Sequence, residues 1–251
     1  MQQSDGYRLR GLWEDLGLGP GMVVMCHSFL PSLGRFIPGP EIVVDTLLEQ
    51  ISPSGTLVVP TFSYSYFQGE VYDVEKTPSL MGVLSEMVRS HPSAVRSLDP
   101  NFSMAAIGPA AETLMHRDIL HSFGPASIYD KLMQADFRVL LLGVDYTALA
   151  LFMHLEKIHA VRYRHDKTFT GTTSYQGRTF PDTAVHFVRD RVLNPVSDRN
   201  RIGALIDHEP ECRKRAFGYG EHRFLPASTV AGVVAEQLSK DPFILIKNPV
   251  G

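Results

Sequence analysis

Cysteine is scarce in this chain, with only Cys26 and Cys212 among 251 residues. Two isolated thiols provide neither a disulfide framework nor a zinc cluster, and such low cysteine usage fits a reducing compartment. Long apolar runs are also missing, because no stretch approaches the roughly 20 residues that a transmembrane helix requires. The first residues lack the apolar segment of a secretory signal peptide. We therefore expect a soluble, cytoplasmic protein without a membrane partner.

Charge of one sign is not in large excess, since 24 lysine and arginine residues stand against 27 aspartate and glutamate residues. The formal net charge of −3 provides no global basic field, so we expect no nucleic-acid partner. Several catalytic motifs are absent from the sequence: the phosphate-binding Walker loop, G-x-G-x-x-G, H-E-x-x-H and G-x-S-x-G. These absences argue against ATP or dinucleotide binding, against a bound metal and against a serine nucleophile.

Short apolar runs alternate with amphipathic segments along the chain up to Lys167. The runs GMVVMCHS, GTLVVPTF and FRVLLLGVD predict buried strands, and PEIVVDTLLEQI and SLMGVLSEMVRS predict helices. This alternation predicts a sheet covered by helices on both faces. The threonine-rich segment 167–190 predicts a hairpin that adds antiparallel strands at one edge of the sheet. We therefore expect an α/β fold with a central mixed β-sheet flanked by helices, folded as a single domain over residues 1–251.

Two loops, residues 26–41 and 121–132, connect a buried strand or loop to the start of a predicted helix. Open α/β sheets bind ligands at the carboxyl ends of their strands, and helix N-termini can hold an anion such as pyrophosphate. Both loops can equally be ordinary connections. Arg199, Arg201 and Arg223 could also meet a phosphate, but arginines are mostly exposed, so we expect them to be surface cations.

The segment LALFMHLEKIHAVRYR, residues 149–164, predicts an apolar helix that nevertheless contains His154 and Glu156. An imidazole with an ordinary pKa near 6.5 suits proton transfer from an amine or a hydroxyl. A carboxylate can orient such an imidazole, but residues two apart on a regular helix do not face each other. The alternative is a hydrogen-bonded core histidine beside a solvated glutamate.

Five motifs follow one another in a fixed order: HSFLPSLGRFIPGPEIVVDTLL, GTLVVPTF, TPSLMGVLSEMVRSHPSAVRSLDP, FGPASIYDKL and VLLLGV. In this order they resemble the aminoglycoside 3-N-acetyltransferase family, also called the antibiotic N-acetyltransferases. The resemblance runs from about Gly21 to the final predicted helix. The segment VRYRHDKTFTG, which follows the helix with His154, is similar to a motif of relatives that act on amino sugars.

The resemblance implies a single α/β domain, acetyl-coenzyme A as the donor and a primary amine as the acceptor. By position, the family's coenzyme contacts fall on His27, Ser28, Ser32, Gly34 and Ser103. The family's general base is the histidine of the pattern L-H-x-x-E. A gap-free alignment places Met153 at this histidine and His154 one residue later, while Glu156 matches the glutamate. The implied catalytic residues are therefore His154 and Glu156.

The favoured function is an N-acyltransferase that moves an acetyl group from acetyl-coenzyme A to an amino sugar, an aminoglycoside-like amine or a natural product. Such an enzyme would serve antibiotic resistance or biosynthesis. His154 would act as general base for direct attack of the amine on the thioester. An acyl carrier protein is a second possible donor, and a homodimer is possible. Two alternatives stay open: a catalytically altered protein that binds coenzyme A or another ligand, and a thioester or amide hydrolase that uses a histidine-activated water.

Overall fold

The computed structural model describes residues 4–37 and 39–247, so residues 1–3, 38 and 248–251 of the predicted domain lie outside the described residues. A seven-stranded sheet has the strand order β4-β5-β2-β1-β6-β10-β9. Its strands are β1 (Val23–Ser28), β2 (Thr56–Pro60), β4 (Val95–Arg96), β5 (Met104–Ile107), β6 (Arg138–Leu142), β9 (Arg213–Phe217) and β10 (Gly220–Pro226). The strand β1 runs parallel to β2 and β6, and the other neighbouring pairs are antiparallel. The predicted central mixed sheet is confirmed.

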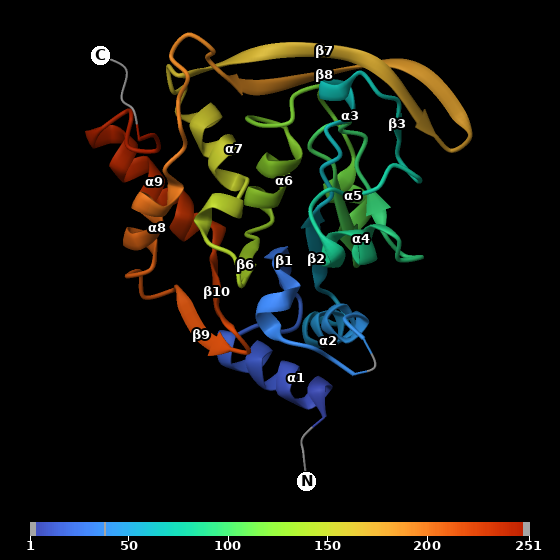
Figure 1. Ribbon diagram of the computed structural model, residues 1–251, viewed down its shortest axis with the longest axis vertical. Helices are drawn as coiled ribbons and strands as arrows, with labels where there is room; N and C mark the ends of the chain where they lie inside the picture. The colour runs from blue at the N-terminus through green and yellow to red at the C-terminus, as the bar shows by residue number, and fades with distance from the viewer. Residues whose placement is uncertain (1–3, 38, 248–251) are drawn as a thin grey trace.

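Helices cover both faces of this sheet, as predicted, because alternate strand residues point to opposite sides. In β1, Val24 and Cys26 enter one core, and Met25 enters the other. The helices of the first core are α1 (Asp5–Leu16), α2 (Glu41–Ile51) and α4 (Val83–Arg89). Those of the second are α5 (Ala111–Met115), α6 (Ile128–Gln134), α7 (Leu151–Ile158), α8 (Arg199–Ile206) and α9 (Ala227–Lys240). In Figure 1, α1 and α2 lie at the bottom of the view, whereas α6 and α7 lie above the sheet.

The threonine-rich segment forms the predicted hairpin, but the hairpin does not join the edge of the central sheet. Its strands β7 (Arg164–Tyr175) and β8 (Arg178–Arg189) pair with β3 (Tyr72–Asp73) in a separate three-stranded sheet. The expectation of an edge position was wrong because β4 and β9 already occupy the two edges of the central sheet. The hairpin lies instead across the top of the molecule, over α7, α6 and the short helix α3 (Ser65–Gln68) (Figure 1). It thereby forms a roof above the second core.

The remaining short elements lie at the carboxyl ends of the parallel strands. The 3-10 helix η1 (Leu30–Leu33) follows β1, and η2 (Tyr146–Ala148) follows β6 and leads into α7. None of the helices in the described part of the chain combines the length and apolarity that a transmembrane span requires.

Candidate active site

The first loop closes tightly onto the end of β6, and this contact positions the predicted coenzyme residues. A side chain at Gly143, which has φ +64°, would collide with Ser32, because its Cβ would lie 1.7 Å from Ser32 Oγ. The Ser32 hydroxyl donates to the carbonyl of Phe29 at 2.7 Å, and the Ser32 carbonyl accepts from the Tyr219 N–H at 2.6 Å. The turn between β9 and β10 therefore holds η1 against the carboxyl edge of the sheet.

Two adjoining cavities open at this edge and share Pro31 and Tyr219. The larger, of about 960 Å³, is lined by Gly34 and by the cationic side chains of Arg8 and Arg35. The smaller, of about 440 Å³, is lined by Ser32. Because α2 begins nearby at Glu41, its free N–H groups and the two arginines form a setting that suits a diphosphate. The structure thus brings Ser32 and Gly34 to one place, directly after His27 and Ser28 at the end of β1.

Ser103 lies apart from these residues, immediately before β5. Its side chain is fully buried, and its hydroxyl donates to the carbonyl of Thr61 at 2.6 Å. The Thr61 hydroxyl in turn donates to Ser103 Oγ at 3.1 Å. These bonds tie the end of β2 to the start of β5. A contact between Ser103 and the coenzyme stays a prediction.

His154 is a buried side chain in the middle of α7, with 2% of its surface exposed. Its Nδ1 accepts a hydrogen bond from the Gly124 N–H at 3.2 Å, and its ring stacks on Tyr129 with 5.9 Å between centroids. An imidazole that accepts at Nδ1 carries its neutral-form proton on Nε2. Burial lowers the pKa of His154 to about 4, and the carboxylate of Asp130 only partly opposes this shift. The imidazole is therefore neutral at pH 7.

The loop that supplies this N–H is fixed by the N-cap of α6. Ser127 accepts from the Asp130 N–H at 3.4 Å and donates its hydroxyl hydrogen to the carbonyl of Gly124 at 2.6 Å. Gly124 has a backbone φ of +97°, a conformation that residues other than glycine rarely adopt. The second predicted loop therefore serves to aim one backbone N–H at His154.

Glu156 is buried as well, so the alternative of a solvated glutamate is wrong. Its Oε2 lies 2.8 Å from Arg164 Nε, and its Oε1 accepts from the Tyr163 hydroxyl at 3.1 Å. Within the described residues no hydrogen bond joins Glu156 to His154, which agrees with the two-residue spacing on a regular helix. Glu156 fastens α7 to the first residue of β7.

Arg199 is 8% exposed and lies in the second core, so its assignment to the surface was wrong. Its guanidinium donates to the carbonyls of Thr147 and Leu149 at 3.1 and 3.0 Å. Burial, together with the charge of Arg199, lowers the pKa of His27 to about 4. Arg199 also opposes the rise that burial causes in the pKa of Tyr129.

Nε2 of His27 and the hydroxyl of Tyr129 are among the five buried side-chain polar atoms that have no hydrogen-bond partner in the described residues. A buried polar atom without a partner costs free energy, so each such atom requires an explanation. His27 lies on the sheet and Tyr129 stacks on His154, so both border the interior between β1, α6 and α7.

A buried network that the sequence did not reveal joins the second loop to the hairpin. Ser122 Oγ bonds both Asp99 Oδ2 and His186 Nδ1, and His186 Nε2 bonds Asn101 Nδ2 at 2.6 Å. Asn101 Oδ1 already accepts from the Phe67 N–H, which fixes the amide orientation and makes His186 Nε2 an acceptor. His186 therefore donates from Nδ1 to Ser122, and Ser122 donates to Asp99. All members are buried and bonded, so the network ties the second loop to the hairpin. Residues 4–37 and 39–247 contain no cluster of three or more His, Cys, Asp and Glu side chains suited to a metal ion.

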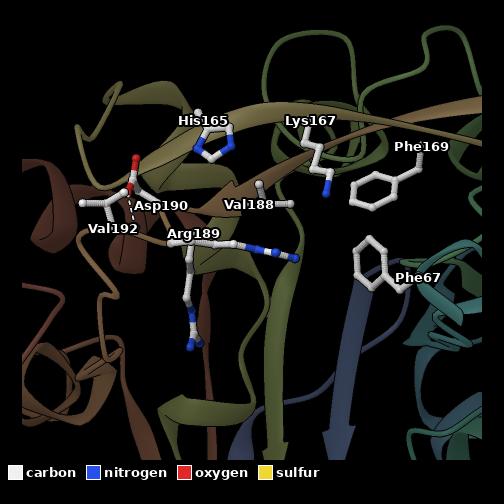
Figure 2. Close-up of a pocket in the computed structure, with 9 residues that line it drawn as sticks. Phe67, His165, Lys167, Phe169, Val188, Arg189, Asp190 and Val192 are labelled. Atoms are coloured by element: carbon white, nitrogen blue, oxygen red, sulfur yellow. Dashed lines mark hydrogen bonds between the residues drawn. The ribbon is translucent and has the colours of Figure 1, made fainter.

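A third cavity, of about 690 Å³, lies beneath the hairpin and is shown in Figure 2. Phe67 of α3 forms one wall, and Lys167 and Phe169 project toward it from β7. A continuous series of ring contacts leads from this wall to His154. The series passes through Phe67, Tyr64, Phe102, Phe123, Tyr129 and His154, with 5.1 to 5.9 Å between successive centroids. The wall of this cavity is therefore linked to His154 through packed aromatic rings.

Comparison with known proteins identifies the family of the chain. A family model described as aminoglycoside 3-N-acetyltransferase matches residues 25–239. Aminoglycoside N(3)-acetyltransferase IV of Salmonella sp is 34% identical over 253 residues, which covers 97% of this chain and 90% of the relative. Aminoglycoside N(3)-acetyltransferase VIII of Streptomyces fradiae is 32% identical over 165 residues, and that match spans only 57% of either chain.

Solved structures share the fold. A crystal structure of aminoglycoside acetyltransferase AAC(3)-IVa, a histidine-to-alanine mutant in complex with a gentamicin, has a TM-score of 0.81 at 26% identity. It covers 98% of this chain and 92% of its own. The binary complex of AAC-IIIb with CoASH has a TM-score of 0.83 at 21% identity and covers 98% of each chain, which shows a common fold.

Proposed function

The chain belongs to the aminoglycoside 3-N-acetyltransferase family, and on that premise we propose that it acetylates a primary amine of an amino sugar with His154 as general base. Membership makes the protein an acyltransferase, with acetyl-coenzyme A as its co-substrate. The observation that carries the proposal is the position of His154: its Nδ1 accepts a hydrogen bond from the second loop, so this nitrogen presents the lone pair that can receive a proton.

The acceptor amine is an ammonium ion in neutral solution, so it must lose a proton before it can attack. In this proposal the proton moves from the amine to Nδ1 of His154, and the amine hydrogen takes the place of the Gly124 N–H. The amine nitrogen bonds to the thioester carbonyl carbon, the carbon–sulfur bond breaks, and the departing thiolate of coenzyme A receives the proton held at Nδ1. The acylated nitrogen then releases its second proton to solvent, which leaves a neutral amide. No covalent bond to the enzyme is formed.

The donor would lie along the first loop. The phosphates of the coenzyme would meet Arg8, Arg35 and the start of α2, and Gly34 would allow close approach. The pantetheine arm would pass Ser32 toward Ser28 and His27 at the end of β1. The unpartnered Nε2 of His27 supports this placement, because a bound thioester would supply the missing partner.

Glu156 would act as a positioning residue. It touches Arg164 and Tyr163 and makes no bond to His154 in the described part of the chain, so its carboxylate holds the end of α7 under the hairpin. This role explains a buried carboxylate in an apolar helix without direct participation in proton transfer.

The test measures transfer of a labelled acetyl group from acetyl-coenzyme A to a panel of amines, for wild type and His154→Ala. We expect kcat to fall by roughly 100- to 10,000-fold, the usual contribution of a general base. Calorimetry should show that the variant still binds coenzyme A, because the first loop is unchanged.

His159→Ala is the matched control, since His159 caps the same helix but its side chain is exposed. This variant should keep wild-type turnover. Undiminished turnover in His154→Ala would remove His154 from the mechanism. Wild-type protein that transfers acetyl to no amine of the panel would overturn the proposed function itself.

A further inference from the structure

We propose that the cavity beneath the hairpin receives an anionic group of the acceptor, so that the substrate is an amino sugar carrying a phosphate or diphosphate. This inference rests on the proposed acetyl transfer and specifies the class of amine that enters it. The cavity lies between the β7–β8 hairpin and Phe67, at the start of the ring series that ends at His154.

The walls of this cavity have a strong excess of positive charge. Lys167, Arg189 and Arg191 line it, together with His165, whereas Asp190 is the only carboxylate among the described residues of the lining. None of these three cationic side chains forms an ion pair within residues 4–37 and 39–247; Arg189 donates only to the Ser197 hydroxyl at 3.3 Å. The whole chain has a net charge of −3, so the lining of this cavity is positive in a protein that is negative overall. Unpaired cations around a concave site favour an anionic ligand.

The single carboxylate can offset only one of the three cationic charges, and it forms no ion pair with them among the described residues. Asp190 Oδ1 accepts from the N–H groups of Val192 and Leu193 at 2.8 and 3.0 Å, as the dashed line in Figure 2 shows for Val192. These backbone hydrogen bonds lower the pKa of Asp190 and tie its carboxylate to the turn after β8. The cationic side chains remain free to meet a ligand.

An aromatic wall lies beside the cations. The rings of Phe67 and Phe169 are 4.7 Å apart between centroids, and Lys167 Nζ lies 4.9 Å from the Phe169 ring (Figure 2). A phenylalanine face suits the apolar face of a sugar ring or a nucleobase, while the lysine and arginine side chains suit phosphate oxygens. A phosphorylated amino sugar combines these two chemistries, whereas a polycationic aminoglycoside would be repelled by the same walls.

In the proposed function the donor lies in a different cavity, at the first loop. Arg8 and Arg35 line that cavity. It lies beside α2, which covers the opposite face of the sheet from α7. The hairpin, in contrast, connects directly to α7. Arg189 stands opposite Arg164 in the β7–β8 register, and Arg164 holds Glu156, two residues beyond His154. An anion bound by the hairpin would therefore lie over the same face of the sheet as the candidate base.

The test compares kcat/KM for glucosamine, glucosamine 6-phosphate, uridine diphosphate-linked glucosamine and gentamicin at saturating acetyl-coenzyme A. We expect at least one phosphorylated acceptor to exceed glucosamine by roughly 10-fold or more, the effect of about 1.4 kcal/mol of added binding. The double variant Lys167→Met/Arg189→Met should remove that advantage and leave the KM for acetyl-coenzyme A unchanged. Arg178→Met is the matched control, because Arg178 is an exposed cation at the far end of the same hairpin, and it should keep the wild-type preference.

Two results would overturn the inference while the proposed function stands. The first is a preference for gentamicin that the double variant leaves intact. The second is a double variant in which only the KM for acetyl-coenzyme A rises, which would assign the cavity to the coenzyme phosphates. Calorimetry with uridine diphosphate on protein saturated with coenzyme A gives a readout that needs no turnover. Binding that the double variant loses supports the inference, and absence of binding to wild type overturns it. Failure to acetylate any amine contradicts the proposed function separately.

Discussion

Glu156 faces Arg164 and turns away from His154: its Oε2 lies 2.8 Å from Arg164 Nε, and both side chains are almost completely buried. Three residues of the segment 149–164 thus have separate tasks. His154 accepts from the second loop, Glu156 holds the start of the hairpin, and Arg164 joins α7 to β7. The ion pair ties the β7–β8 hairpin to the helix that carries the candidate base.

Glu156→Gln should destabilise the protein strongly. The substitution leaves the Arg164 guanidinium buried without a countercharge, which typically costs about 3 to 5 kcal/mol. The free energy of unfolding, measured by urea denaturation at about pH 7.5, where carboxylates are ionised, should fall by about this amount.

Glu236→Gln is the control for this measurement, since Glu236 pairs with Lys240 on the surface of α9. Exposed pairs contribute about 0.5 kcal/mol or less, so its unfolding free energy should hardly change. Equal losses in the two variants would contradict the structural role of the buried pair.

The architecture of the central sheet could be predicted because its evidence is local. Apolar runs at β1, β2 and β6, each followed by a helical pattern, are enough to predict parallel strands covered by helices. The place of the hairpin could not be predicted in this way. Its alternating pattern predicts two paired strands, but the choice between the edge of one sheet and a separate sheet depends on which edges are already occupied.

In the candidate site, too, the sequence predicts the residues that share one segment and misses those that only the fold brings together. His27, Ser28, Ser32 and Gly34 lie together because they belong to one continuous segment. The buried Arg199 was missed, since composition assigns a charged side chain to the surface by default. The network of Asp99, Ser122 and His186 joins residues that are 23 and 64 positions apart, and no local pattern indicates such contacts.

Acid should destabilise the fold through its buried histidines. Burial lowers the pKa of His154 and of His27 to about 4, against about 6.5 in an unfolded chain. Between these values the unfolded state binds more protons, so the free energy of unfolding is largest above about pH 6.5 and falls toward pH 4. Each histidine contributes up to about 1.4 kcal/mol per pH unit in that window.

Denaturation curves between about pH 7.5 and 5, a range that spans the unfolded-state pKa, check this expectation. His154→Asn should show a shallower pH dependence than wild type, while His159→Ala, at an exposed position on the same helix, should keep the wild-type slope. A slope in His154→Asn that equals wild type would mean that His154 is protonated to the same extent in both states.

Gly124→Ala should impair both the fold and the reaction, because Gly124 has φ +97° and its N–H bonds to His154. An added Cβ would lie 2.9 Å from Cγ of Lys157, a flexible side chain, so the strained backbone angle is the larger cost, about 1 to 2 kcal/mol. A displaced loop should also lower kcat by roughly 10- to 100-fold, since proton transfer depends on the geometry at Nδ1.

Gly232→Ala separates this effect from a general glycine effect. Gly232 lies inside α9, and a Cβ there would meet no atom of the described residues within 4 Å. Alanine should stabilise that helix by about 0.5 to 1 kcal/mol and leave turnover unchanged. If Gly124→Ala kept full kcat while it lost stability, the loop would serve the fold alone, and the proton route through Nδ1 of His154 would have to be abandoned.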